Sequence, residues 1–222
     1  MSERFSETWD SASSQNYTIT STLQADNDWF INVQKFPVSV YSHSILESMV
    51  LGRPDGTTLS TLTGYDTHSV LLDSDLNPET LPVRLCGAVV FGTLTSSGRA
   101  QSHYGAWDSA SSQNYSINFN NQNTKNPFSL QVNDTTVEIG SAGDQVSNDI
   151  WEFDVIFSQE SSSSTQVDYS IYQNGELYAT DSVIIDDAVS EGTVFNEVFL
   201  QFRQRALIAF DDLRIFSYES EE

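Results

Sequence analysis

Hydrophobic and polar residues alternate along most of the chain, which is the pattern of β-strands with one buried face. In residues 150–157 the side chains of Trp151, Phe153 and Val155 fall on one face, with polar residues between them. No segment shows the spacing of an amphipathic helix. Strands are predicted at residues 17–23, 29–33, 38–41, 45–51, 69–72, 83–92, 115–119, 128–132, 150–157, 167–171, 176–178, 194–202 and 207–218.

Turn residues separate these short segments. Asn174-Gly175 favours a tight hairpin, because both central residues of that turn need positive φ. The serine run at 161–164 is typical of a solvated hairpin loop. Many short strands separated by turns predict an all-β protein with an antiparallel β-sandwich. No change of composition marks a boundary, so we expect residues 1–222 to form a single domain.

A nine-residue segment occurs twice. The sequence Trp-Asp-Ser-Ala-Ser-Ser-Gln-Asn-Tyr fills residues 9–17 and recurs without change at 107–115. The similarity fades on both sides, so the chain is not two complete tandem domains. One interpretation is that two equivalent corners of the sandwich use the same loop. The other is that the two loops are exposed recognition or subunit-contact sites.

The net charge of the chain bears on its environment and on its partners. Asp and Glu number 31 against 9 Lys and Arg, for a formal net charge of -22, and Lys35 and Lys125 are the only lysines. Such a surface repels itself in dilute buffer and is shielded in concentrated salt, which favours a protein of a hypersaline environment; an ordinary acidic protein is the alternative. The same charge argues strongly against binding to nucleic acid, whose phosphates need basic partners.

Membrane insertion and standard export are also not expected. No stretch approaches the ~20 apolar residues of a membrane span. The polar start of the chain is unlike a secretory signal. The single cysteine, Cys86, is predicted to be a buried, inert thiol.

Candidate catalytic groups are few. Glu152 and Asp154 share one face of a predicted strand, as a glycosidase carboxylate pair would. Ile156 and Phe157 stand where a third acid would fall, so a glycoside hydrolase is the least favoured hypothesis. His43, His68 and His103 lack metal-ligand spacing and are expected to be ordinary polar or half-buried residues.

Three segments of the second half resemble consecutive landmarks of laminin-G-like domains. They are Trp-Glu-Phe-Asp-Val at 151–155, Asn-Gly-Glu-Leu at 174–177 and Asp-Asp-Leu-Arg-Ile at 211–215. The resemblance covers residues 115–218 and implies the concanavalin A-like jelly roll of lectins and glucanases, with surfaces that often bind glycans. It also implies a calcium ion near the closing strand, where Asp211 and Asp212 match. The alternative is that these two aspartates form a polar turn.

These observations together favour a non-enzymatic structural or attachment protein of a halophilic virus. A virion protein is made in the host cytoplasm and reaches the outside without an export signal. Its expected partners are other virion proteins, copies of itself and host surface glycans. The alternative is a host carbohydrate-binding or adhesion module at the cell surface or outside the cell. In both hypotheses the contact residues are aromatic side chains expected to be exposed in polar loops: Trp9, Tyr17, Tyr104, Trp107 and Tyr115.

Overall fold

The structure, a computed structural model, describes residues 2–9, 15–16, 22–24, 28–33, 39–46, 48–52, 65–94, 100–203 and 207–217. Every regular element in this part of the chain is a β-strand. The described residues accordingly contain no helix long and apolar enough to cross a membrane.

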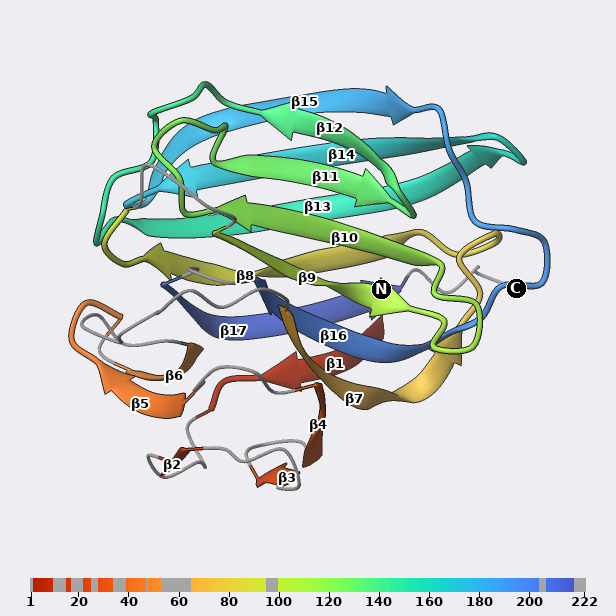
Figure 1. Ribbon diagram of the computed structural model, residues 1–222. Coiled ribbons are helices and arrows are strands. Elements are labelled where there is room, and N and C mark those ends of the chain that lie inside the picture. Colours follow the sequence, from red (N-terminus) through yellow and green to blue (C-terminus); the bar gives the residue numbers. More distant parts are fainter. Residues whose placement is uncertain are drawn as a thin grey trace.

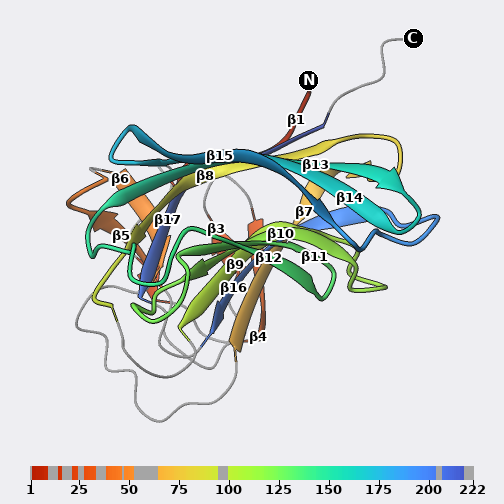
Figure 2. The same cartoon turned by 90° about the horizontal axis from the view of Figure 1, so that it is seen from above.

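The strands form two antiparallel sheets that lie face to face (Figures 1 and 2). In sheet A the order is β15-β14-β13-β8-β17-β6-β5-β2, and β1 also pairs with β17. In sheet B the order is β12-β11-β10-β9-β16-β7-β4-β3. The strands of sheet A are β1 (Ser2–Glu7), β2 (Gln15–Asn16), β5 (Ser39–His43), β6 (Ser48–Gly52), β8 (Val83–Phe91), β13 (Ile150–Ser161), β14 (Ser164–Gln173), β15 (Glu176–Ile185) and β17 (Ile208–Ser217). Those of sheet B are β3 (Thr22–Gln24), β4 (Asp28–Val33), β7 (Tyr65–Leu76), β9 (Gln101–Trp107), β10 (Asn114–Asn120), β11 (Phe128–Val132), β12 (Thr135–Ile139) and β16 (Phe195–Arg203).

The core fills the space between the sheets and is rich in aromatic side chains. The ring of Phe119 from sheet B packs against Phe153 and Phe210 of sheet A, at 5.2 and 5.3 Å between centroids. Tyr115 lies parallel to Phe157 of the opposite sheet at 4.8 Å. Because successive strand residues point to opposite faces, these contacts fix which residues of each strand point away from the core.

The predicted strands and turns of the second half are confirmed. Residues 128–132 form β11 with the predicted bounds, and the predicted segment at 150–157 begins the longer β13. Asn174 and Gly175 both have positive φ, 51° and 81°, as the predicted hairpin requires. The serine run lies at the turn between β13 and β14.

The prediction missed β1, β2, β9 and β12. Strand β9 has the polar Ser102 at an inward position and Gly105 and Trp107 at outward positions, so its alternation is weak in the sequence. Of the predicted strand at 17–23, only residues 22 and 23 belong to the described chain, within β3. The rest of that segment, Tyr17 included, lies outside the described residues.

Candidate functional site

The aromatic residues predicted as exposed contacts are mostly part of the core. Trp9, Tyr104 and Tyr115 are fully buried, so the expectation of exposure is wrong for these three. Tyr104 and Tyr115 occupy inward positions of β9 and β10, and Trp9 joins the core cluster directly after β1. Trp107 is half-buried. The first tryptophan of the repeated segment is therefore buried and the second is half-buried, while residues 10–14, the loop of the first copy, lie outside the described residues.

A row of uncharged polar side chains crosses the outer face of sheet B. Ser129, Asn118, His103 and Gln201 are successive cross-strand partners on β11, β10, β9 and β16. Their chain neighbours Leu130, Phe119, Tyr104 and Phe202 point into the core. The four residues, here called the polar row, therefore face away from the core.

Two atoms of the polar row lack a hydrogen-bond partner although they are buried. The amide nitrogen Nδ2 of Asn118 donates to Ser129 Oγ at 3.2 Å and to Gln131 Oε1 at 2.8 Å, but its Oδ1 accepts nothing. His103 Nε2 is also without a partner. The exposed fractions of Asn118 and His103 are 3% and 7%. Buried polar atoms without partners are uncommon and costly, so this pair of neighbours needs an explanation.

The imidazole of His103 is neutral in the folded protein. Burial, and in second place the positive charge of Arg203, lower the pKa of His103 to about 3. A neutral imidazole has one nitrogen that donates and one that accepts. The polar row therefore offers hydrogen bonds without formal charge at neutral pH.

An aromatic pair lies beside the polar row. Trp107 and Phe199 are on the same outer face, with ring centroids 5.1 Å apart, and Trp107 Nε1 donates to Glu197 Oε2 at 3.3 Å. Gly105 lies between this aromatic pair and the polar row, and it has no side chain. A Cβ there would overlap the carbonyl oxygen of Tyr115 and lie 2.7 Å from Ser116 Cβ. Strands β9 and β10 therefore approach each other in a way that only glycine permits.

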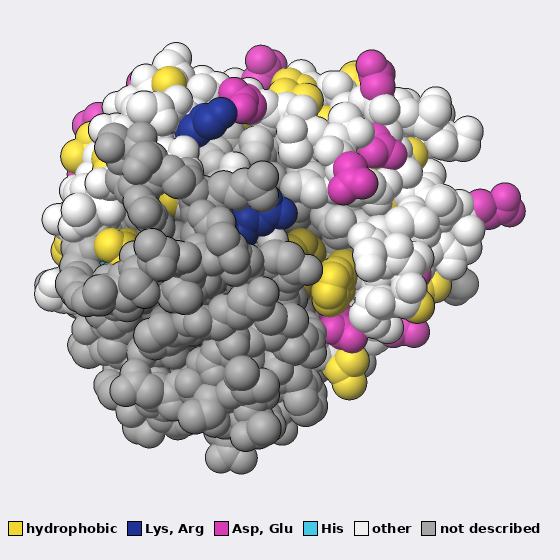
Figure 3. Space-filling model, viewed as in Figure 1, with side chains coloured by type: hydrophobic (Ala, Val, Ile, Leu, Met, Phe, Trp, Pro, Cys, Tyr) yellow, Lys and Arg dark blue, Asp and Glu magenta, His cyan; other side chains and the backbone are white. Residues whose placement is uncertain are grey.

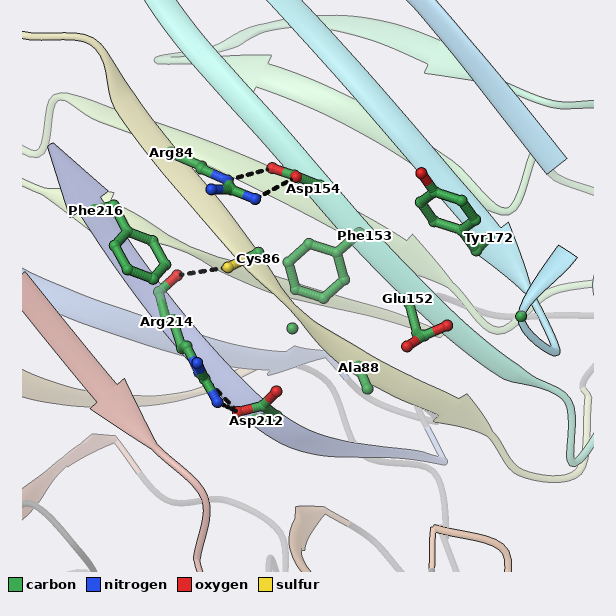
Figure 4. Close-up of a pocket in the computed structure, with 12 residues that line it drawn as sticks. Arg84, Cys86, Ala88, Glu152, Phe153, Asp154, Tyr172, Asp212, Arg214 and Phe216 are labelled. Atoms are coloured by element: carbon green, nitrogen blue, oxygen red, sulfur yellow. Dashed lines mark hydrogen bonds and ion pairs between the residues drawn. The ribbon is translucent and has the colours of Figure 1, made fainter. Parts of the chain in front are cut away.

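A hollow of about 620 Å³ lies on the outer face of sheet A (Figure 4). Its floor consists of the small residues Cys86, Gly87 and Ala88 of β8. Glu152, Asp154 and Tyr172 line one side, and Asp212, Arg214 and Phe216 line the other.

Ion pairs hold two groups of the hollow in place. Arg84 donates to both carboxylate oxygens of Asp154, at 2.6 and 2.5 Å, and its guanidinium lies 5.5 Å from the ring centre of Phe216. Arg214 pairs with Asp212 at 2.7 Å. Glu152 shares the face with Asp154, as the sequence predicted, but Asp154 is held in its ion pair and is not placed as a nucleophile.

Cys86 is only half-buried, so the prediction of a buried thiol is wrong in part. Burial is nevertheless the largest influence on this group and raises the pKa of the Cys86 thiol to about 11. At neutral pH the thiol therefore stays protonated and reacts slowly.

The residues suggested for calcium do not fit that ion. The carboxylate of Asp212 is paired with Arg214, and Asp211 Oδ1 accepts a hydrogen bond from the Asp212 amide at 2.9 Å. Within the described part of the chain, no group of three or more His, Cys, Asp or Glu could hold a metal ion. Calcium needs six to eight oxygen ligands. The polar-turn alternative agrees with this geometry, and Asp212 has the positive φ of 48° typical of such a turn.

The polar row was missed in the sequence, where His103 was interpreted as an ordinary residue. A signal for it exists. Uncharged polar residues occupy alternate positions of three successive strands, at Gln101 and His103, at Ser116 and Asn118, and at Ser129 and Gln131. The strands of sheet A carry charged residues at the corresponding positions.

The chain was also compared with known proteins. Several solved structures share its architecture over nearly all of its length. A lectin from Bauhinia forficata in complex with GalNAc has a TM-score of 0.57 at 13% identity and covers 95% of this chain and all of its own. The fold is that of the concanavalin A-like lectins. The acidic lectin of winged bean, in complex with methyl-α-D-galactose, has this lectin-like fold with a TM-score of 0.55 at 12% identity, and covers 94% of this chain and all of its own.

Enzymes share the lectin-like fold as well. A marine alginate lyase from Aplysia kurodai has a TM-score of 0.54 at 10% identity and covers 82% of this chain and 87% of its own. No protein-family model and no curated protein sequence matches the chain. At these identities the comparisons show the fold, and the function has to be argued from the side chains.

Proposed function

We propose that the protein is a carbohydrate-binding module that holds a saccharide on the polar row of sheet B. The observation that carries this proposal is the pair of unpartnered atoms, His103 Nε2 and Asn118 Oδ1, on cross-strand neighbours. A hydroxyl group both donates and accepts a hydrogen bond. Both atoms are buried in the free protein, so the two side chains have to turn outward on binding; with the proton on Nε2, one sugar hydroxyl then accepts from His103 and donates to Asn118.

The surroundings of the pair favour a neutral saccharide. The polar row has no formal charge, whereas the whole chain carries -22, which repels a polyanion at low salt. Trp107 is half-buried on the same face and offers a ring on which the apolar side of a sugar can pack. The structural neighbours from Bauhinia forficata and winged bean were solved with GalNAc and a galactoside, so these two sugars are the first probes.

Calorimetric titration with GalNAc, galactose and neutral oligosaccharides tests the proposal. We expect binding that falls at least tenfold in His103→Leu, because a site that hydrogen-bonds a hydroxyl loses about 1.5 kcal/mol or more when one partner is removed. Ser162→Ala, in the exposed turn between β13 and β14, is the control and should bind unchanged. Saccharide affinity that is the same in His103→Leu and in the unaltered protein would refute the site.

We also propose that the module is not an enzyme. The carboxylates Glu152 and Asp154 lie on sheet A, on the opposite side of the molecule from the polar row, and Asp154 is engaged by Arg84. Alginate is a polyanion, which the charge of this chain disfavours. Incubation with alginate and with neutral glycans, followed by measurement of reducing ends, should show no release. Release that depends on His103 would make the chain a lyase or hydrolase instead.

The place of the module in a virion stays a prediction. Its support is the sequence: an acidic surface suited to concentrated salt, together with a glycan-binding type of fold. On the face seen in Figure 3, the carboxylates of the described residues are scattered and do not form one patch. Mass spectrometry of particles purified from a halophilic lysate would find this chain if it is a virion protein. Its presence in the cell envelope alone would support the host adhesion module.

A further inference from the structure

The hollow on sheet A results from a local irregularity of the closing strand. Between Asp211 and Arg214, β17 has one residue more than β8 has between Ala88 and Cys86, which makes a β-bulge. Asp212 in the bulge adopts positive φ. Gly87 lies opposite, and a Cβ there would be 2.8 Å from Leu213 and 3.2 Å from the Asp212 carbonyl oxygen. The bulge thus requires a small residue on β8, and the small residues of β8 form the floor of the hollow.

The groups around this floor are held in defined positions before any ligand arrives. Asp154 is fixed by two hydrogen bonds from Arg84, and Asp212 by Arg214. The ring of Phe216 packs beneath Arg84, and Tyr172 stands across the hollow from it (Figure 4). Pre-positioned groups lose less conformational entropy when they bind, which favours affinity.

One carboxylate in the hollow remains available. Glu152 points over the floor near Ala88 (Figure 4) and makes no hydrogen bond or ion pair with the described part of the chain. A carboxylate accepts hydrogen bonds through both oxygens, and bonds to a charged acceptor are the stronger ones. Two neighbouring hydroxyl groups match this acceptor.

We propose that this hollow is a second saccharide-binding site, separate from the polar row and on the opposite face of the sandwich. Glu152 accepts hydrogen bonds from adjacent hydroxyls of a neutral sugar, and the rings of Tyr172 and Phe216 border its apolar faces. A volume of about 620 Å³ lies within the range of small-molecule sites. An anionic sugar is disfavoured, because three carboxylates and two guanidinium groups line the hollow.

The single cysteine of the chain provides a test that reports on this site alone. Cys86 lies on the floor of the hollow and is half-buried, whereas the polar row is on the other sheet. The full-length protein is treated with N-ethylmaleimide at pH 8.5, with and without neutral hexasaccharides of glucose, mannose, galactose or N-acetylglucosamine. A hexasaccharide at ten times its dissociation constant should slow modification of Cys86 about tenfold, because about one-tenth of the sites stay free.

Variants on the two faces separate this proposal from that for the polar row. Glu152→Gln and Tyr172→Ala should each weaken sugar binding in the hollow. The same protection of Cys86 should then require about ten times more sugar. His103→Leu should leave protection unchanged even where it abolishes binding on sheet B. Ser162→Ala is again the control.

Three results would overturn the second site. The first is that no hexasaccharide of the panel slows the modification. The second is protection that is lost in His103→Leu and kept in Glu152→Gln, which would place all binding on sheet B. The third is protection by simple amines such as methylammonium but not by sugars, which would make the hollow a cation site. Since each site has its own readout, failure of one leaves the other testable.

Discussion

The outer faces of the two sheets satisfy their polar groups in opposite ways. On sheet A, Arg84, Asp154, Arg214 and Asp212 are charged, partly exposed and paired with one another. On sheet B the polar row is uncharged and its middle members are buried, and two of its atoms have no partner. Half-exposed ion pairs contribute little to stability, whereas buried unpartnered groups cost stability. In the proposed saccharide site, the ligand would supply the hydrogen bonds that His103 Nε2 and Asn118 Oδ1 lack.

The largest expected effect on stability comes from replacing the glycines at which neighbouring strands approach each other closely. Gly105→Ala should lower the free energy of unfolding by more than about 4 kcal/mol, because the new Cβ overlaps backbone atoms of β10 that cannot move without breaking the pairing. Gly87→Ala is the matched variant on sheet A. There the nearest atom is the end of the Leu213 side chain, which can turn away, so we expect a loss of about 1–2 kcal/mol. Denaturant unfolding measures both, and equal losses would contradict the comparison.

The next effect is a pH dependence that belongs to sheet B. The pKa of His103 is about 3 in the folded protein and about 6.5 in an unfolded chain. Between these two pKa values the imidazole of His103 is protonated in the unfolded chain and neutral in the folded chain. The neutral imidazole therefore makes its full contribution to the free energy of unfolding above pH 6.5. This contribution is lost as the pH falls towards 3, with about 3 kcal/mol lost at pH 4.

Comparison with His103→Phe isolates this contribution, since the many carboxylates titrate alike in both proteins. Unfolding free energies measured from pH 7 to pH 4 should fall about 3 kcal/mol further in the unaltered protein. Parallel pH curves would show that His103 is not buried as described.

A smaller effect should separate stability from binding. At neutral pH, His103→Phe replaces a buried, unpartnered imidazole with an apolar ring of similar shape. We expect a gain of about 1 kcal/mol in unfolding free energy together with loss of saccharide binding on sheet B. Thermal unfolding and calorimetric titration give the two readouts. A destabilised variant would point to a structural role for the imidazole.

The smallest effect concerns the ion pairs of sheet A. Asp154→Asn should cost less than about 1 kcal/mol in dilute buffer, since both partners are about one-third exposed. The cost should shrink further in 1 M salt, where the Debye length is ~3 Å. Glu160→Gln is the control, because it removes one negative charge from an exposed position that has no such pair. If the two variants lose the same stability, the pair with Arg84 contributes nothing.

The sequence predicted most strands of the second half because their alternation has a strong apolar side. Strand β13 shows this, with Trp151, Phe153 and Val155 buried and Glu152 exposed between them. The hairpin at Asn174 and Gly175 was predictable for a local reason, since few residues tolerate positive φ.

The site was harder to predict because alternation does not tell which polar faces are buried. Tyr104 and Tyr115 stand among polar residues in the sequence and were expected to be exposed. In the fold these two rings are the inward residues, and the polar neighbours His103 and Ser116 are buried on the outer face. Cross-strand partners such as Asn118 and His103 are distant in the sequence, so their meeting depends on the register of β9 and β10.

The pairing of β1 with β17 brings the two ends of the described chain together. Ser2 and Ser217 are direct cross-strand partners. A short peptide can therefore join these ends, and the chain can be reopened at the exposed turn between β13 and β14 without removing any strand. Such a circularly permuted protein would carry its attachment point at that turn, which allows the module to be fixed to a surface in a new orientation.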